Sequence, residues 1–454
     1  MTGRYKAYPE YKSTDEVWLG NVPSHWRDLK INRLTIVKRG ASPRPIDDPK
    51  YFDEAGEYSW VRIADVTASD TYLENTPQRL SPLGASLSVK LEPNELFLSI
   101  AGTVGKPCIN KIKVCIHDGF VYFPEYKENT KFLFYIFAAG EAYKGLGKFG
   151  TQLNLNTETV GGIKIGIPCI EEQHKIVNFL DHETAKIDSL IAKQEKLIEL
   201  LKEKRQAVIS HAVTKGLNPD APMKDSGVEW LGEVPEHWVV AQLKFNTKLM
   251  QTGPFGSQLH AEDYVEGGVP LINPAHMING EIVPDPQVSV DADTQDRLSR
   301  HKLAEGDIIF ARRGELGRCA VVTDQQVGWI CGTGSLKATL NERLIPEYAY
   351  LLITSDGVVA ELSLESKGST MDNLNTETLG KIRTPVPPVH EQRAILAYVD
   401  EVSGKYKHLV DLAENAIGLM KERKTALISA AVTGKIDVRH FVVEQGQPQG
   451  VQDE

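Results

Sequence analysis

The sequence has few cysteines and no long apolar run. Its 454 residues include only Cys108, Cys115, Cys169, Cys319 and Cys331. They show neither paired metal-ligand spacing nor a disulfide framework, so we expect reduced thiols and assign them no role. No apolar run approaches the roughly 18 residues of a membrane span, and residues 1–9 lack the apolar core of a signal peptide. We therefore expect a cytoplasmic protein that does not contact a membrane.

Basic side chains are outnumbered as well. The chain carries 51 lysine and arginine residues against 61 aspartate and glutamate residues, a net charge of −10. Because phosphate contacts need lysine and arginine, this balance argues against tight non-specific binding of nucleic acid. Residues 27–153 nevertheless carry slightly more basic than acidic side chains, whereas residues 239–372 are acidic. A binding site depends on local charge, and partners are expected to supply part of the positive surface.

Catalytic motifs are scarce. Residues 102–106, Gly-Thr-Val-Gly-Lys, lack the glycine spacing and the final hydroxyl residue of a phosphate loop, and are better explained as a glycine turn. Residues 273–276, Asn-Pro-Ala-His, faintly resemble the Asn-Pro-Pro-aromatic loop of amino-methyltransferases, but no glycine-rich cofactor fingerprint precedes them. His25 and His237 each precede a tryptophan in equivalent segments, so we expect them to pack a domain junction. The sequence predicts no catalytic residue, metal site or cofactor site.

The chain does contain an internal repeat. Residues 18–26, Trp-Leu-Gly-Asn-Val-Pro-Ser-His-Trp, return at 230–238 with two substitutions, an offset of 212. Residues 154–159, Asn-Leu-Asn-Thr-Glu-Thr, return at 373–378, and the same offset of 219 relates Glu172-Gln173 to Glu391-Gln392. A period of about half the chain is too long for a solenoid. The repeat predicts two domain-sized copies, each with a variable segment bounded by shared ones.

Two long helices are predicted, one after Pro168 and one after Pro388. Apolar residues recur there at alternating spacings of three and four, as in a coiled-coil seam. Glutamates in the first turns, with Gly216 and Gly434 after the last, are typical of helix ends. The predicted seam residues are Ile176, Leu180, Ile187, Leu190, Leu197, Leu201 and Val208 in the first helix, and Ile395, Val399, Val402, Tyr406, Leu409, Met420 and Leu427 in the second.

Each helix would be on the order of 60 Å long at ~1.5 Å per residue, enough to hold two domains apart. Near-equal copies linked by a full domain favour a pseudo-two-fold arrangement, which makes the helices antiparallel. In that register Glu183 of the first seam comes near Arg423 of the second, and such a pair would help to fix the alignment. The alternative is that both are solvated charges at a helix edge.

The variable segments are expected to be mixed strand and loop with a late helix. Residues 95–100 and 307–312 are predicted buried strands, each followed by a glycine turn, at 102–105 and 314–317. They align at the offset of 212. The two segments would therefore share a fold while differing in most side chains, as differing specificity on a common scaffold requires.

Polar side chains of the variable segments are the candidates for DNA contact. Arg312 and Arg313 follow a predicted strand, where they could bind guanine edges, clamp phosphates, or remain solvated surface arginines. Two equivalent loops before the shared Asn-Leu-Asn block suit phosphate contact, unless they are simple turns. The full set is Arg39, Arg44, Arg62, Lys148, Thr151, Gln152, Arg312, Arg313, Lys367, Ser369 and Thr370.

These motifs resemble those of the specificity subunits of type I restriction-modification systems. The carrying motifs are Trp-Leu-Gly-x-Val-Pro-x-His-Trp, present twice, and the Asn-Leu-Asn-Thr-Glu block that leads into Glu-Gln and a long helix. The resemblance implies an α+β fold with two mixed α/β target-recognition domains, two long antiparallel coiled-coil helices and a pseudo-two-fold repeat. It implies that each domain binds one half of a bipartite, asymmetric sequence of double-stranded DNA.

The resemblance also implies partners. Two methyltransferase subunits would bind S-adenosylmethionine and methylate adenine, and restriction subunits would use ATP and Mg²⁺, so this chain would need no cofactor and have no catalysis of its own. Two other functions stay open. A methyltransferase fused to its own DNA-binding part should show a cofactor fingerprint, and a protein-only coiled-coil scaffold would not need two diverged domains.

Five regions follow from the repeat. Residues 1–153 hold the first shared block and recognition domain, and 154–217 the first helical region. Residues 218–372 and 373–437 are their second copies. Residues 438–454, rich in glutamine and glycine, are expected to be a disordered tail.

Overall fold

The computed structural model describes residues 5–144, 146, 155–314, 316–366 and 374–442. The chain forms two compact units, each described here by itself. Unit 1 comprises Met1–Glu195 with Glu414–Glu454, and unit 2 comprises Lys196–Ala413. Within the described residues, no helix is both long and apolar enough to cross a membrane.

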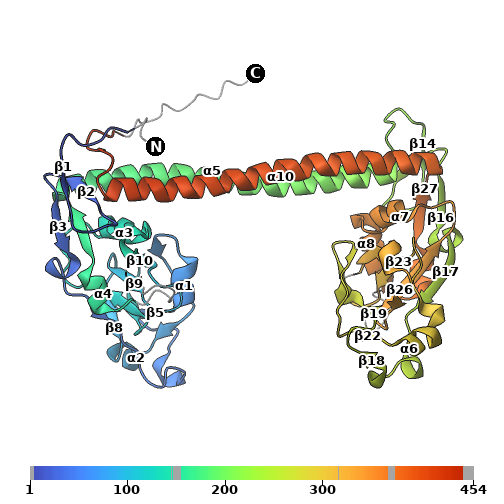
Figure 1. Cartoon of the computed structure of the whole chain (residues 1–454), viewed down its shortest axis with the longest axis horizontal. Helices are drawn as coiled ribbons and strands as arrows, with labels where there is room; N and C mark the ends of the chain where they lie inside the picture. The colour runs from blue at the N-terminus through green and yellow to red at the C-terminus, as the bar shows by residue number, and fades with distance from the viewer. Residues whose placement is uncertain (1–4, 145, 147–154, 315, 367–373, 443–454) are drawn as a thin grey trace. The chain divides into compact units, whose positions relative to one another are not determined.

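Two long helices, α5 (Ile170–Lys215) and α10 (Val389–Val432), contribute to both units. Their 46 and 44 residues correspond to about 65–70 Å each. In unit 1 the start of α5 lies beside the end of α10, and in unit 2 the end of α5 lies beside the start of α10, so the helices are antiparallel in each unit (Figure 1).

Burial along the two helices corrects the predicted seam. Of the predicted residues, Ile176, Leu180, Ile187, Ile395, Val399, Val402 and Leu427 are buried, and Leu201, Val208, Tyr406 and Met420 are half-buried. Leu190, Leu197 and Leu409 are instead 48%, 43% and 46% exposed. Their neighbours Ile191, Ile198 and Val410 take the covered positions.

The cause is one additional spacing of four residues between covered positions in each helix. Covered positions follow one another at 180, 183, 187 and 191 in α5, and at the equivalent 399, 402, 406 and 410 in α10. Such a stutter, eleven residues in three turns, locally unwinds a coiled coil. The predicted pair of Glu183 with Arg423 is wrong for the same reason. Arg423 is exposed, and Lys424 Nζ lies 2.7 Å from Asp188 Oδ1.

The variable part of unit 1 contains two small sheets and the helices α1 (Ile63–Ala68), α2 (Pro82–Ser86) and α3 (Thr130–Ala138). The first sheet has the order β4 (Lys38–Arg39), β12 (Phe120–Tyr122), β9 (Leu96–Ser99), β10 (Pro107–Asn110), β6 (Tyr72–Leu73). The second has the order β7 (Arg79–Leu80), β5 (Tyr58–Val61), β11 (Val114–Ile116), β8 (Val89–Leu91). All residues of β9 and β10 are buried, as expected for strands covered on both faces.

The variable part of unit 2 repeats this plan. One sheet has the order β17 (Thr247–Thr252), β26 (Ser335–Leu340), β23 (Ile308–Ala311), β24 (Cys319–Val321), and the other β18 (Tyr264–Val265), β22 (Ser289–Val290), β19 (Val269–Ile272), β25 (Ile330–Cys331). A hairpin of β20 (Met277–Ile278) and β21 (Glu281–Ile282) and the helices α6 (Ala292–Arg297), α7 (Pro346–Ile353) and α8 (Asp356–Ser366) complete it. The two runs predicted as buried strands are β9 and β23, so the shared scaffold is confirmed.

The shared sequence blocks build what we call the frame of each unit. In unit 1 the frame contains β1 (Tyr11–Ser13), β2 (Asn21–Pro23), β3 (Arg27–Lys30), α4 (Thr157–Gly162) and β13 (Lys164–Ile167); in unit 2 it contains β14 (Met223–Asp225), β15 (Glu233–Pro235), β16 (Val239–Gln242), α9 (Thr376–Lys381) and β27 (Arg383–Val386). Strand β3 pairs with β13, and β16 with β27, which closes each variable part at its two ends. The second asparagine of the shared block, Asn156 or Asn375, caps the following short helix.

Val438 and Phe441 pack against unit 1, contrary to the prediction that the tail begins at 438. Val438 is buried, and the Phe441 ring lies 5.0 Å from the ring of Phe179 on α5. These apolar side chains provide contacts that the overall composition of the segment conceals. The rest of the predicted tail, 443–454, lies outside the described residues.

Candidate nucleic-acid interface

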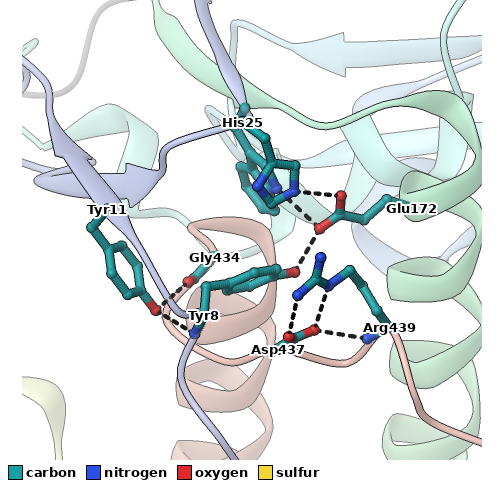
Figure 2. A network of polar contacts seen from close by, with 8 residues as sticks. Tyr8, Tyr11, His25, Glu172, Gly434, Asp437 and Arg439 are labelled. Atoms are coloured by element: carbon teal, nitrogen blue, oxygen red, sulfur yellow. Dashed lines mark hydrogen bonds and ion pairs between the residues drawn. The ribbon is translucent and has the colours of Figure 1, made fainter.

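The glutamate of the shared Glu-Gln pair at the start of each long helix anchors its frame. In unit 1, Glu172 accepts hydrogen bonds from Tyr8 Oη at 2.7 Å and Trp26 Nε1 at 3.1 Å, and lies 2.8 Å from His25 Nε2. Figure 2 shows Tyr8 and His25 converging on this carboxylate. In unit 2, Glu391 lies 2.7 Å from His237 Nε2 and accepts a hydrogen bond from Trp238 Nε1 at 2.6 Å. The repeated His-Trp therefore binds the start of a helix, which is the junction role predicted for it.

The glutamine that follows each glutamate connects the helix to the variable part. Gln173 donates to Pro168 O at 3.0 Å and accepts from the backbone of Asn129, the residue that caps α3, also at 3.0 Å. In unit 2, Gln392 donates to Pro387 O at 2.8 Å, and Ile345 N, just before α7, donates to it at 2.8 Å. The shared Glu-Gln pair thus holds the frame with one side chain and the variable part with the other.

Four segments of unit 1 meet where strands of its two sheets end, and we call them the first loop cluster: residues 40–44, 62–67, 100–106 and 117–119. Backbone bonds join them, from Gly40 N to Phe120 O at 2.9 Å and from Ile100 N to Gly119 O at 2.8 Å. The hydroxyls of Thr67 and Thr103 lie 2.7 Å apart. Side chains from four separate segments therefore face one region.

Three predicted DNA-binding residues lie in or directly beside the first loop cluster. Arg39, at the end of β4, donates through Nε to the backbone oxygen of Asp118, and Arg44 Nη2 lies 3.2 Å from the Asp118 carboxylate. Arg62 follows β5, which pairs in parallel with β11, and bonds to Gln78. His117 precedes Asp118, and burial holds the pKa of His117 below its ordinary value against the opposing effect of Asp118. Arg39 and Arg44 therefore meet at Asp118, while Arg62 lies on another segment of the cluster.

The same four positions meet in unit 2 as the second loop cluster: residues 253–258, 273–276, 312–314 with 316–318, and 332–334. Gly253 N donates to Ser335 O at 2.9 Å, and Arg312 N donates to Gly334 O at 2.9 Å, which are the counterparts of the two backbone bonds above. Arg318 Nη1 lies 3.4 Å from Pro274 O. The scaffold matches the first cluster, while most of its side chains differ.

Arg312 and Arg313, both predicted DNA-binding residues, belong to the second loop cluster. Arg312 is half-buried and donates through Nε to Leu374 O at 3.1 Å. Its burial and the neighbouring charge of Arg313 hold the pKa of Arg312 below its ordinary value. Arg313 is exposed. The remaining candidates, Lys148, Thr151, Gln152, Lys367, Ser369 and Thr370, lie outside the described residues.

Sequence reasoning missed several members of the clusters. His117 and Lys106 in the first, and Asn273 and Arg318 in the second, were not chosen. Asn273 occupies the position of Arg62, since each follows a strand that pairs in parallel with a later one. The available signal for Arg62 and Asn273 was a buried strand followed by a polar residue. The pairing that groups them with other loops joins strands more than fifty residues apart in sequence, which local patterns do not reveal.

One glycine in each loop cluster allows a close contact between two backbone segments. A β-carbon at Gly40 would lie 2.2 Å from His117 O, and one at Gly253 would lie 1.8 Å from Gly332 O. No side chain fits so close to a carbonyl oxygen. Both loops therefore approach the neighbouring backbone more closely than any other residue allows.

The loop clusters carry side chains that can donate hydrogen bonds. Arginine, asparagine and threonine at loop tips can donate to phosphates and to base edges. Cys108, Cys115, Cys319 and Cys331 are buried, which raises the pKa of each thiol to about 12, so these thiols stay protonated at neutral pH. Within the described ranges, no three His, Cys, Asp or Glu side chains are grouped to hold a metal ion.

Comparison with known proteins agrees with this architecture. The family model described as the type I restriction modification DNA specificity domain matches residues 23–200 and again 236–408, together more than half of the chain. The chain belongs to this type I DNA specificity family. Each match spans one variable part and the first portion of the helix that follows it, so the repeat corresponds to two specificity domains.

Relatives of this type I specificity chain match from about three fifths to nearly all of it. The putative type I restriction enzyme MjaX specificity subunit of Methanocaldococcus jannaschii is 23% identical over 94% of this chain and 97% of that protein. The type I restriction enzyme EcoKI specificity subunit of Escherichia coli K12 is 24% identical over 62% of this chain and 60% of that protein.

Solved structures share the fold. A chain from a study of complex assembly and conformational transition of the type I R-M system superposes with a TM-score of 0.62 at 15% identity, covering 90% of this chain and 98% of that one. The HsdS subunit of Thermoanaerobacter tengcongensis gives a TM-score of 0.52 at 15% identity, covering 91% of this chain and 98% of that subunit.

Proposed function

We propose that this chain binds a bipartite, asymmetric sequence of double-stranded DNA, one half with each loop cluster. The observation that carries the proposal is the contrast within the repeat. Four strands of one sheet follow the equivalent orders β4-β12-β9-β10 and β17-β26-β23-β24, and the joining backbone bonds are equivalent in both clusters, while most side chains differ. A common scaffold with different side chains is what two different half-sites require. The overall acidity agrees with local rather than general DNA affinity.

The proposed contacts divide by chemistry. Arg312, held in place by Leu374 O, is proposed to donate to a base edge, because a positioned guanidinium discriminates between bases better than a mobile one. Arg39, Arg44 and Arg62 are proposed to contact phosphates or bases of the other half-site. Arg313 is proposed as a phosphate contact since it is exposed beside Arg312. The candidates beyond the described residues, such as Lys148 and Lys367, remain proposals from the sequence alone.

The partners are proposed from the family. The relatives above are named specificity subunits of type I restriction enzymes, which implies separate catalytic subunits. We expect two methyltransferase subunits that use S-adenosylmethionine and restriction subunits that use ATP and Mg²⁺, while this chain contributes no catalytic group. Its frames, which repeat the His-Trp and Glu-Gln residues in both copies, are the proposed attachment points.

The long helices are proposed to set the unread spacer between the half-sites. Inserting about 25 residues, seven turns at 3.6 residues per turn, at the same level of α5 and α10 would add roughly 37 Å. This is close to one turn of DNA, so the spacer should lengthen by about eleven base pairs, with both half-sites unchanged and facing the same side. Altered half-sites would contradict a spacer role for the helices.

The test is a map of N6-methyladenine in a methylation-free host that expresses this chain with its methyltransferase partner. In a second strain, residues 31–163 are replaced by 243–382, so that the β3–β13 pair still closes the exchanged part. We expect a split motif in the first strain. In the second, the half-site assigned to unit 1 should be replaced by a repeat of the other half. A matched control, Leu190→Gln on the exposed face of α5, should leave the motif unchanged.

Two other outcomes favour the alternatives. A complex that assembles but methylates no defined motif would support the protein-only scaffold. Binding of S-adenosylmethionine by the purified chain alone would support a self-contained methyltransferase.

A further inference from the structure

The two frames differ in how completely they cover the anchoring glutamate. Glu172 meets three donors and its side chain is 5% exposed, whereas Glu391 meets His237 and Trp238 and is 31% exposed. The third donor of unit 1 is Tyr8. The position equivalent to Tyr8 at the offset of 212 is Asp220, which cannot place a phenol there.

The reason lies in the path of the chain. In unit 1 two separate segments cover the frame, residues 5–11 before β1 and 433–442 after α10, joined by the bond from Asp437 N to Lys6 O at 2.7 Å. The Tyr8 ring is enclosed between them, 5.7 Å from the His25 ring and 4.9 Å from the guanidinium of Arg439 (Figure 2). In unit 2 one connector, residues 216–222, runs from α5 to β14, and four of its residues, 217–220, are exposed. The single connector of unit 2 does not fill the volume that two segments fill in unit 1.

A cavity remains beside Glu391 in unit 2. It measures about 130 Å³ and is lined by Gly216, Leu217, Pro235, His237, Glu391 and Ile395, among others. A dry cavity of roughly 150 Å³ takes a benzene ring. The space is therefore close to that of one aromatic side chain, and it has an acidic acceptor in its wall.

An aromatic ring beside the cavity is uncovered as well. Phe179 on α5 is fully buried in unit 1, where the rings of Tyr5 and Phe441 contact it at 5.2 and 5.0 Å. Its equivalent on α10, Tyr398, is 39% exposed. We call this surface of unit 2, formed by Leu217, His237, Glu391, Ala394 and Tyr398, the open frame face.

We infer that the open frame face binds an extended segment of a methyltransferase subunit, and that a tyrosine of this segment donates its phenol hydrogen bond to Glu391 as Tyr8 does to Glu172. The inference rests on the proposed function for the identity of the partner. The chain itself supplies the template, because its own residues 5–11 and 433–442 cover the equivalent surface of unit 1 with a phenol in the same relation to the carboxylate.

Two arguments favour a constant subunit over other occupants. The face is built from the shared frame rather than from the loops that differ between copies, so its occupant can stay the same whatever sequence is bound. A second copy of this chain could offer residues 5–11 only by uncovering its own Glu172 and the ring of Phe179, which are buried by them. A DNA phosphate is disfavoured by the charge of Glu391.

The experiment places fluorotryptophan throughout the chain and follows the ¹⁹F signals of Trp26 and Trp238, which bond to Glu172 and Glu391. Each signal is assigned by a Trp→Phe variant. Adding the methyltransferase subunit should shift the Trp238 signal and leave that of Trp26 in place. A synthetic peptide of residues 4–12 should also shift the Trp238 signal. The same peptide carrying Tyr8→Phe should need an at least about tenfold higher concentration to give the same shift, because a hydrogen bond to a charged acceptor contributes that much to the affinity.

A matched pair of variants tests the cavity itself. Ala394→Trp fills the space beside Glu391 and should weaken methyltransferase binding at one site by about tenfold or more. Lys175→Trp changes the equivalent position of unit 1, which is exposed, and should leave the affinity unchanged.

The outcomes separate the two proposals. A complex of the expected mass that methylates DNA, but in which the Trp238 signal does not move or Ala394→Trp binds normally, overturns the inference and leaves the proposed function intact. A Trp238 shift that accompanies self-association without the methyltransferase assigns the face to a second copy and also overturns it. Failure to form any complex or methylate any motif counts against the proposed function instead.

Discussion

The first copy of the frame surrounds Glu172 with three donors and two chain segments, whereas the second copy offers Glu391 two donors and a single connector. The residues that orient the helices, His-Trp and Glu-Gln, are the same in both. The difference arises because two separate segments, 5–11 and 433–442, cover the first copy, whereas one connector, 216–222, covers the second. Duplication thus preserved the bonds that fix geometry, while the covering of those bonds depends on the path of the chain.

The loop clusters extend the comparison. Gly40 and Gly253, and the backbone bonds beside them, are equivalent, yet Arg62 stands where the second copy has Asn273, and His117 where it has Gly332. Backbone contacts are kept and side chains are exchanged. The copies therefore separate the part of the domain that must fold from the part that is free to vary.

The largest effect is expected at the anchoring glutamates. Glu172→Ala should cost about 3–5 kcal/mol, because it leaves three donors without their buried acceptor. Glu391→Ala should cost less, on the order of 1–2 kcal/mol, since water reaches the site. Hydrogen exchange of the peptides 21–30 and 233–242 measures each frame locally. Equal losses in the two frames would remove the distinction between the closed and the open copy.

The helix seam gives the next effect. Ile191→Ala should destabilise the protein by about 2–3 kcal/mol, while Leu190→Ala, one residue away and exposed, should stay within about 0.5 kcal/mol. In the second copy Val410→Ala should likewise exceed Leu409→Ala, by a smaller margin because Val410 is half-buried. Thermal unfolding compares the four variants. A greater loss of stability in Leu190→Ala than in Ile191→Ala would support the strict seven-residue seam instead.

A third effect concerns DNA. Arg312→Ala should cost about 1–3 kcal/mol of binding and relax selectivity at one position of one half-site. Arg44→Ala should cost less binding free energy, because the Arg44 side chain is 80% exposed. It should weaken binding to all sequences alike and lower the slope of DNA affinity against salt concentration by about one. Titrations of the assembled complex with singly substituted duplexes at two salt concentrations distinguish the two. A uniform loss for Arg312→Ala would make it a phosphate contact.

The smallest effect is a pH dependence of the first cluster. Burial keeps the pKa of His117 below its ordinary value, so the unfolded chain takes up a proton first as the pH falls. The contribution of His117 to stability is present above about pH 6.5 and is lost as the pH falls from there through the lowered pKa. In the His117→Gln variant, the local stability of residues 114–122 that hydrogen exchange reports should change less between pH 7 and pH 5. An unchanged profile would assign the dependence to another group.

Local patterns predicted the helices, the two buried strands and the repeat, because periodicity and end residues are properties of neighbouring positions. The register of the seam was not predictable in the same way. Leu190 and Ile191 are both apolar, as are Leu409 and Val410, so the pattern does not choose between them. The choice is made by the partner helix, which the sequence leaves unspecified.

The site was predicted only in part for a related reason. Arg39, Arg44, Arg62 and Arg312 were found as basic residues in variable loops, but their grouping depends on parallel pairing between distant strands. The acceptor of the shared His-Trp was also hidden, because Glu172 lies 147 residues from His25. Equivalent residues in a repeat indicated a common role without revealing the contact.

Gly40 and Gly253 limit how such a protein can be redesigned. Each leaves no room for a β-carbon, so randomising these positions along with their loops would mostly yield unfolded domains. Libraries that hold them fixed, together with Gly256, whose φ is +59°, and vary the residues at 42–44, 62 and 117–118, or at 255, 257–258, 273 and 312–313, keep the backbone intact. New specificities are then to be sought by changing what stands on the loops, leaving the loops themselves where they are.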